Sequence, residues 1–243
     1  MVWIVAATDV ALVALHLLTG LSVVSLDEES NLASWYSSLK LSTIALVSLA
    51  LYAVRSPGSS GAGAARAWAL NALLFLALSA DEAASLHERF SRFALDLPLL
   101  AALRSMLIGQ DQAKASHAWV ALLLPVALAL LAFFVVLACK NLEARPGLIA
   151  LAFGGLACLA LAMGLETLML TWFPPLVDWG PEQVERYRVA TTVEECGEIL
   201  GATLLLSAFS LLLARRLSPG GADPGAAEVE LSARPAGPPG PRG

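Results

Sequence analysis

Long apolar segments alternate with short polar connections along the chain, and this pattern predicts membrane-spanning helices. About 20 apolar residues cover the roughly 30 Å of hydrocarbon in a bilayer, and six segments have that length. We expect helices rather than barrel strands, because the segments do not alternate apolar and polar residues with period two. The predicted spans are Val2–Leu26, Leu32–Val54, Ala65–Leu86, His117–Cys139, Gly147–Trp172 and Arg188–Ala214.

The segments outside the spans add two predictions. Between the third and fourth spans, Leu99, Leu103 and Met106 recur at helical spacing, which predicts a short amphipathic helix in the headgroup region. Residues 218–243 are rich in Pro and Gly and predict a disordered tail. The predicted fold is therefore an all-α, polytopic transmembrane bundle of six helices in residues 1–217, with a short interfacial helix between spans three and four.

Composition supports a membrane protein and excludes other classes. The chain is 58% hydrophobic and 14% charged, whereas soluble domains are about 45–50% apolar and about 25% charged. A soluble fold of this size has too little polar surface for such a chain. The net charge of -5 gives no basic field that would attract nucleic acid. Membrane lipids are the expected partners and nucleic acid is not, while the pattern leaves protein partners open.

Basic residues in the shortest connections predict the orientation. Arg55, Arg66, Lys140 and Arg145 flank these connections, and Arg215–Arg216 follow the last span. Lys and Arg in short loops favour the cytoplasmic side, so we expect both termini in the cytoplasm. Arg strongly outnumbers Lys, which is typical of a GC-rich bacterial genome. A multi-pass protein of the bacterial inner membrane is expected.

Ionisable residues inside the spans fall at similar depths. At about 1.5 Å rise per residue, Glu166 lies about 9 Å before the end of span five, and Glu194 about 9 Å into span six. Asp9 is predicted near the opposite, cytoplasmic face. The residues predicted to share the non-cytoplasmic half of the bundle are Asp81, Glu82, Glu166, Glu194, Glu195, Glu198, His16 and Lys40.

Acids at this depth need an explanation, because an ionised acid at a helix centre costs roughly 2.5–3.5 kcal/mol. They must lie near the interface, be protonated, be paired, bind a metal or line a wet cavity. One interpretation is a set of interfacial ion pairs with nearby cations, namely Arg89, Arg92, Arg186, Arg188 and Lys40. The other is a functional polar site.

If the site holds a metal, its oxygen-rich donors with imidazole favour Zn, Mn or Fe. The predicted ligands are Asp81, Glu82, His87, Glu195 and Glu198. Glu88 or Glu194 is the predicted general base, since burial among acids suits a carboxylate to that role. His16, Lys40 and Glu166 complete the polar site, and for His16 we expect a hydrogen bond within the bundle. The zinc-protease motif is incomplete, because the second His after His87-Glu88 is missing.

Three segments together resemble an uncharacterised family of bacterial six-span integral membrane proteins. They are NLASWYSS at residues 31–38, DEAASLHE at residues 81–88 and EECGEILG at residues 194–201. The resemblance implies an architecture and a site, and it transfers no activity. Lys40 departs from it, because an apolar residue is expected there in such proteins.

Three functions remain open from the sequence. The leading one is a metal-dependent, membrane-embedded enzyme that acts on a lipid-like substrate from the non-cytoplasmic side. The second is a proton or cation carrier, which needs ionisable residues across the whole membrane; only Asp9 and His16 extend the row. The third is a non-catalytic scaffold or sensor, in which basic partners satisfy the acids.

Overall fold

The computed structural model describes residues 2–19, 21–26, 31–54, 61–86, 118–142, 145–172 and 179–218, with the single residues 89, 98 and 102. These residues are all-α and contain no strand. The predicted disordered tail lies outside the described residues, and so does the predicted interfacial helix apart from those three single residues. The helices are α1 (Val2–Thr19), η1 (Ser22–Val24), α2 (Leu32–Ala53), α3 (Gly61–Ala84), α6 (Ala118–Asn141), α7 (Pro146–Trp172) and α8 (Pro181–Leu217).

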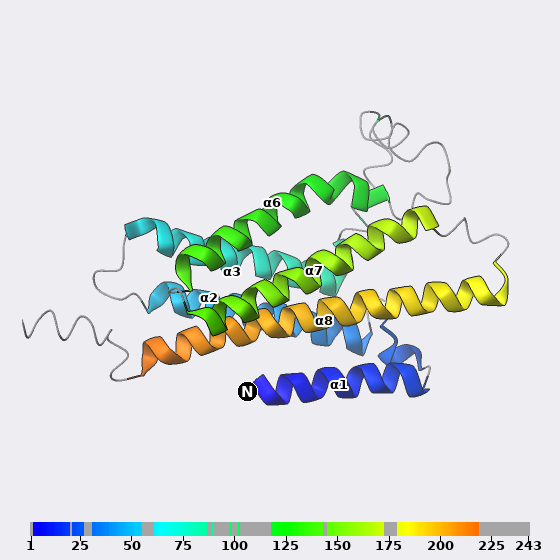
Figure 1. Cartoon of the computed structure of the whole chain (residues 1–243), viewed down its shortest axis with the longest axis horizontal. Helices are drawn as coiled ribbons and strands as arrows, with labels where there is room; N and C mark the ends of the chain where they lie inside the picture. Colours follow the sequence, from blue (N-terminus) through cyan, green and yellow to red (C-terminus); the bar gives the residue numbers. More distant parts are fainter. Residues whose placement is uncertain are drawn as a thin grey trace, which may run out of the picture.

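The helices run along a common long axis, and successive helices run in opposite directions (Figure 1). α7 packs along α8, α2 packs on both α3 and α8, α6 covers α7, and α1 lies against the other side of α8. Four of them, α2, α3, α7 and α8, are long and apolar enough to cross a membrane. Two shorter apolar helical stretches, Trp3–Thr19 and Leu128–Asn141, accompany these four.

The first helix is shorter than predicted. We expected it to reach Leu26, but α1 ends at Thr19 and the turn η1 follows. At this point side chains accept hydrogen bonds from backbone amides. The amide of Leu21 donates to Thr19 Oγ1 (3.3 Å), and the amide of Leu26 donates to His16 Nδ1 (3.1 Å). These bonds compete with the helical pattern, so the chain turns before the predicted end.

The last helix is longer than predicted. It begins at Pro181 rather than Arg188 and ends at Leu217 rather than Ala214. Pro181 suits the first helical position, and the Gln183 side chain accepts from the amide of Gly180 at 3.0 Å. Charged residues then continue the helix, with ion pairs along one side such as Arg186–Glu182 at 2.6 Å. The bounds of the other helices differ from the predicted spans by a few residues only.

The hydrophobic core occupies one half of the bundle. It is built where α2 and α8 end and where α3 and α7 begin. Trp68 stacks edge-on against Phe209, with ring centroids 5.1 Å apart, and Phe75 packs against Phe134 at 5.2 Å. Leu212 is 0% exposed. This half is close-packed and mostly apolar, and it also encloses Ser48 and Asn71, both 0% exposed, where the Asn71 amide donates to Ser48 Oγ at 2.6 Å.

Glycines allow α7 and α8 to approach closely. A Cβ on Gly201 would lie 2.9 Å from the carbonyl oxygen of Gly155 and 2.8 Å from Cγ of Leu159. A Cβ on Gly197 would lie 3.3 Å from that of Ala162. Small residues at such a crossing let two helices pack backbone against backbone. The contact fixes how α7 and α8 are aligned along their length.

Candidate functional site

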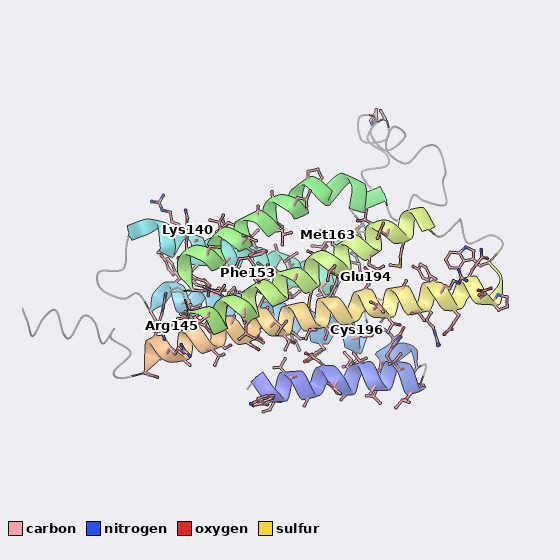
Figure 2. The ribbon with its side chains drawn as sticks, in the orientation of Figure 1. Lys140, Arg145, Phe153, Met163, Glu194 and Cys196 are labelled. Carbon is pink, nitrogen blue, oxygen red and sulfur yellow. The ribbon has the colours of Figure 1, made fainter. Side chains whose placement is uncertain are left out.

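Both ends of the bundle carry basic side chains, but the described acids of α3, α7 and α8 gather at one end. The end where α3 and α7 begin and α6 and α8 finish carries basic residues, and Lys140 and Arg145 are visible there in Figure 2. The described basic residues of this end are Arg66, Lys140, Arg145, Arg215 and Arg216. The described acids of α3, α7 and α8 all lie in the other half of the bundle. We call the two halves the basic half and the acidic half.

The alignment of α7 and α8 brings two carboxylates to one level. Ala162 meets Gly197 on one side of this level, and on the other side Thr191 Oγ1 lies 4.0 Å from Sδ of Met169. Glu166 and Glu194 fall between these contacts, on the facing sides of the two antiparallel helices. Glu194 is 8% exposed and lies on the α7 side of α8 in Figure 2. Two acids distant in sequence therefore lie at one level of the same helix interface.

The alignment of α2 and α3 adds Asp81 and Glu82 to this level. Ser38 Oγ donates to the carbonyl oxygen of Ser79 at 2.9 Å, and the hydroxyls of Ser42 and Ser79 lie 2.7 Å apart. Asp81 and Glu82 follow Ser79 within one turn of α3. Because α2 and α3 are antiparallel, both acids lie level with the turn of α2 that precedes Ser42.

The alignment of α2 and α8 shows that Asp81 and Glu82 lie at the same level as Glu166 and Glu194. Lys40 Nζ donates to the carbonyl oxygen of Ile199 at 3.1 Å and to Thr203 Oγ1 at 3.0 Å. The two helices run in the same direction (Figure 1). Residues 194–198, just before Ile199, therefore lie level with the first turns of α2. Acids from α3, α7 and α8 thus share one level of the acidic half.

Exposure differs among these acids. Glu194 is buried and Glu198 is exposed. The remaining four, Asp81, Glu82, Glu166 and Glu195, are half-buried. Within the described part of the chain, no group of three or more His, Cys, Asp or Glu is placed to hold a metal ion. Four of the five predicted ligands, Asp81, Glu82, Glu195 and Glu198, belong to that part, and the structure does not gather three of them around one metal position. His87 and Glu88 lie outside the described residues, so their roles as ligand and general base stay predictions.

A buried ion pair, which the sequence reasoning missed, lies next to this level. Lys40 Nζ lies 2.7 Å from Asp9 Oδ1, and the two side chains are 2% and 11% exposed. The three protons of the ammonium group find three acceptors: Asp9, the carbonyl of Ile199 and the hydroxyl of Thr203. Lys40 was expected, with several arginines, as a partner for the acids of spans three, five and six. Its ion-pair partner is Asp9 on α1.

The carboxylate of Asp9 is satisfied as completely as the ammonium group. Tyr36 donates its hydroxyl to Oδ1 at 2.7 Å, and the hydroxyl of Thr203 donates to Oδ2. Lys40 Nζ also lies 4.8 Å from the centre of the Tyr36 ring, within the range of a cation–π contact. The pair is therefore closed to further ligands, and it ties α1 to α2 and α8. We call these residues, Asp9, Tyr36, Lys40 and Thr203, the ion-pair cluster.

His16 provides a second tie between α1 and α8. Its Nε2 lies 3.3 Å from Thr192 Oγ1, and its Nδ1 accepts the amide of Leu26. Because Nδ1 accepts, Nε2 carries the proton and donates to Thr192, whose own hydroxyl donates to the carbonyl of Arg188. The hydrogen bond within the bundle that we expected for His16 is therefore present. Both nitrogens are used, which leaves the ring no lone pair for a metal.

Between these two ties lies an apolar layer. Leu12 and Ile199 are 6% and 4% exposed and pack with Ala33 and partly buried Cys196. Figure 2 shows Cys196 on the side of α8 that faces α1, opposite Glu194. Polar groups along α1 therefore do not form a continuous row, because this layer separates His16 from Asp9.

Comparison with known proteins gives one match. Residues 1–213 match the family model of a domain of unknown function, DUF8692. The matched segment contains the acids, the ion-pair cluster and all the described helices except the end of α8. No curated protein and no solved structure matches the chain.

Proposed function

Since the chain belongs to the DUF8692 family, we propose its role from its own residues: it is a membrane-embedded enzyme whose carboxylate site opens to one side of the membrane. The substrate is lipid-like, with a polar head that reaches the acids and an apolar part that stays among the helices. The geometry of α2, α3, α7 and α8 supports this proposal, because acids from three helices share one level.

The proposed topology has six spans. α1 and α6 complete the four longer helices, and at about 1.5 Å per residue the 18 residues of α1 extend about 27 Å, close to the hydrocarbon thickness. Exposed Trp3, Ile4 and Leu18 on α1 suit contact with lipid. The basic half then faces the cytoplasm by the positive-inside rule. In this topology both termini lie in the cytoplasm, and the protein spans the inner membrane of a bacterium.

One observation carries the proposal: the acids are closed off from the basic end. Toward that end lie first the ion-pair cluster, in which the Lys40 ammonium and both oxygens of Asp9 are hydrogen-bonded, and then the close-packed core around Trp68 and Phe209. A carrier needs a polar route to both sides of the membrane. Packing of this kind favours a site reached from the acidic end alone, and it weighs against the proton or cation carrier.

The chemistry of the site follows from its donors. Glu166 and Glu194 lie at one level of the α7–α8 interface, where carboxylates close together favour a shared proton or a cation. A divalent Zn, Mn or Fe ion would supply that charge and polarise a bound ester or water. Its proposed ligands are drawn from Asp81, Glu82, His87, Glu195 and Glu198. Glu194 or Glu88 would take the proton from the attacking water.

Metal content tests this site. The full chain, purified in mild detergent without added metal, should contain a stoichiometric divalent metal by elemental mass spectrometry. Glu195→Gln and His87→Ala should each lose most of it, because replacing a ligand weakens the metal's hold by more than the roughly 10–100-fold seen for outer-shell partners. Glu185→Gln, an exposed residue of the same helix, should keep it.

A metal-free protein with unchanged folding in all three variants would contradict the metal site. It would favour the second candidate, a non-catalytic scaffold or sensor. One observation favours that candidate independently: the saturated ion-pair cluster fits a purely structural role, in which buried charges fix how helices assemble.

A further inference from the structure

An open hollow lies at the basic end of the bundle, far from the acids. Its volume is about 460 Å³, and it is formed where α7 begins and α8 finishes. Its lining consists of Arg145, Pro146, Gly147, Leu148, Leu151, Leu211 and Arg215. None of these residues belongs to the ion-pair cluster or to the acid level.

The lining has two parts of different chemistry. Arg145 and Arg215, on separate helices, supply two exposed guanidinium groups. Leu148, Leu151 and Leu211 supply the apolar part, and Leu211 remains 41% exposed. This combination suits an amphipathic anion. The acyl chains of such a ligand would contact the apolar side chains, and its headgroup would contact the two arginines.

The start of α7 adds to the attraction for an anion. The carbonyl of Arg145 accepts the amide of Ile149 at 3.0 Å, which makes Arg145 the residue that opens the helix. A helix N-terminus carries partial positive charge and presents amide donors. A Cβ added to Gly147 would meet nothing within 4 Å, so there is space over this first turn.

We propose that this hollow binds an anionic phospholipid, with the phosphodiester between Arg145 and Arg215 and an acyl chain along Leu148, Leu151 and Leu211. Basic pockets between spanning helices bind acidic headgroups in this way. Charge complementarity selects the anion, and the apolar lining selects a lipid over a free phosphate. The site is independent of the proposed enzyme site, which lies in the opposite half of the bundle.

Native mass spectrometry of the full chain in detergent tests the proposal. Phosphatidylglycerol should bind more tightly than phosphatidylcholine, and inorganic phosphate at the same concentration should not displace it. Arg145→Gln and Arg215→Gln should each weaken phosphatidylglycerol binding about five-fold, and the double variant more than ten-fold. Lys140→Gln removes a basic residue of the same end that does not line the hollow, and it should leave binding unchanged.

Three results would overturn the lipid site. Equal binding of the two lipids would show that charge does not select the ligand. If Lys140→Gln weakened phosphatidylglycerol binding as much as the arginine variants, general electrostatic attraction by the basic end would explain binding without a defined site. Displacement by inorganic phosphate would show an anion site without a role for the acyl chain. Leu151→Gln, with both arginines intact, separates the apolar contribution, because it should weaken phosphatidylglycerol binding while the thermal unfolding temperature reports the fold.

Discussion

Replacing Lys40 with methionine should lower the free energy of unfolding by about 3–5 kcal/mol, because it leaves the carboxylate of Asp9 buried without its counter-charge. The Asp9 side chain is 11% exposed, and Lys40 supplies the only full positive charge among its described partners. Unfolding of the detergent-solubilised protein by a denaturing detergent, followed by circular dichroism, measures the change.

Two further variants separate charge from packing. The double variant Asp9→Leu with Lys40→Met should recover most of the lost stability, since replacing both members of a buried pair by apolar groups is often neutral. Arg188→Met breaks an exposed pair with Glu185 and should cost less than about 1 kcal/mol. If Lys40→Met costs no more than Arg188→Met, the ion pair does not hold α1 in the bundle.

Substituting Gly201 with alanine should destabilise the protein by about 1–3 kcal/mol, the cost of overpacking a close contact. The new methyl group would lie 2.9 Å from the backbone oxygen of Gly155, which cannot move without separating α7 from α8. Helix association in membranes depends on such packing. The same unfolding experiment measures the loss.

Gly164→Ala is the matched control for this substitution. Gly164 lies on α7, and a Cβ there would meet nothing within 4 Å. Because alanine favours a helix interior over glycine by about 1 kcal/mol, this variant should be neutral or slightly more stable. Equal effects of the two substitutions would mean that glycine content, rather than the α7–α8 contact, determines stability.

The sequence predicted the helices well because a membrane span needs a long apolar run. α2, α3, α7 and α8 begin and end where hydrophobicity changes, apart from the polar first turns of α8. The shared level of Glu166 and Glu194 was also predictable, since it depends only on the rise per residue and on alternating direction. The start of α8 lies outside the apolar run. It is set by hydrogen bonds such as that from the Gly180 amide to the Gln183 side chain, which hydropathy does not reveal.

The ion-pair cluster was missed for a traceable reason. With a first helix that continues to Leu26, Asp9 falls near the cytoplasmic face and Lys40 in the opposite half. With α1 ending at Thr19, Asp9 lies about 15 Å before that end, close to the depth of Lys40 at about 12 Å into α2. The bond from the Leu26 amide to His16 that accompanies the turn joins residues distant in sequence, so periodicity does not report it. Two opposite charges in neighbouring apolar spans were the signal available.

The two halves of the bundle are packed differently. In the basic half, large apolar side chains such as Phe75 and Leu212 hold five helices together. In the acidic half, a smaller apolar cluster around Leu12 and Ile199 lies beside the carboxylates, and the ion-pair cluster lies at the boundary. The larger core therefore supplies most of the packing of the bundle.

Labelling of the acid level from each side of the membrane shows whether the proposed carboxylate site opens at the acidic end alone. A single cysteine, Glu195→Cys, is placed in a chain whose Cys139, Cys158 and Cys196 are replaced by alanine, and a membrane-impermeant maleimide is added to either side of sealed vesicles. Glu185→Cys and Arg216→Cys mark the acidic and basic ends. We expect Glu195→Cys to react only from the side that labels Glu185→Cys. Reaction from the side that labels Arg216→Cys would contradict it.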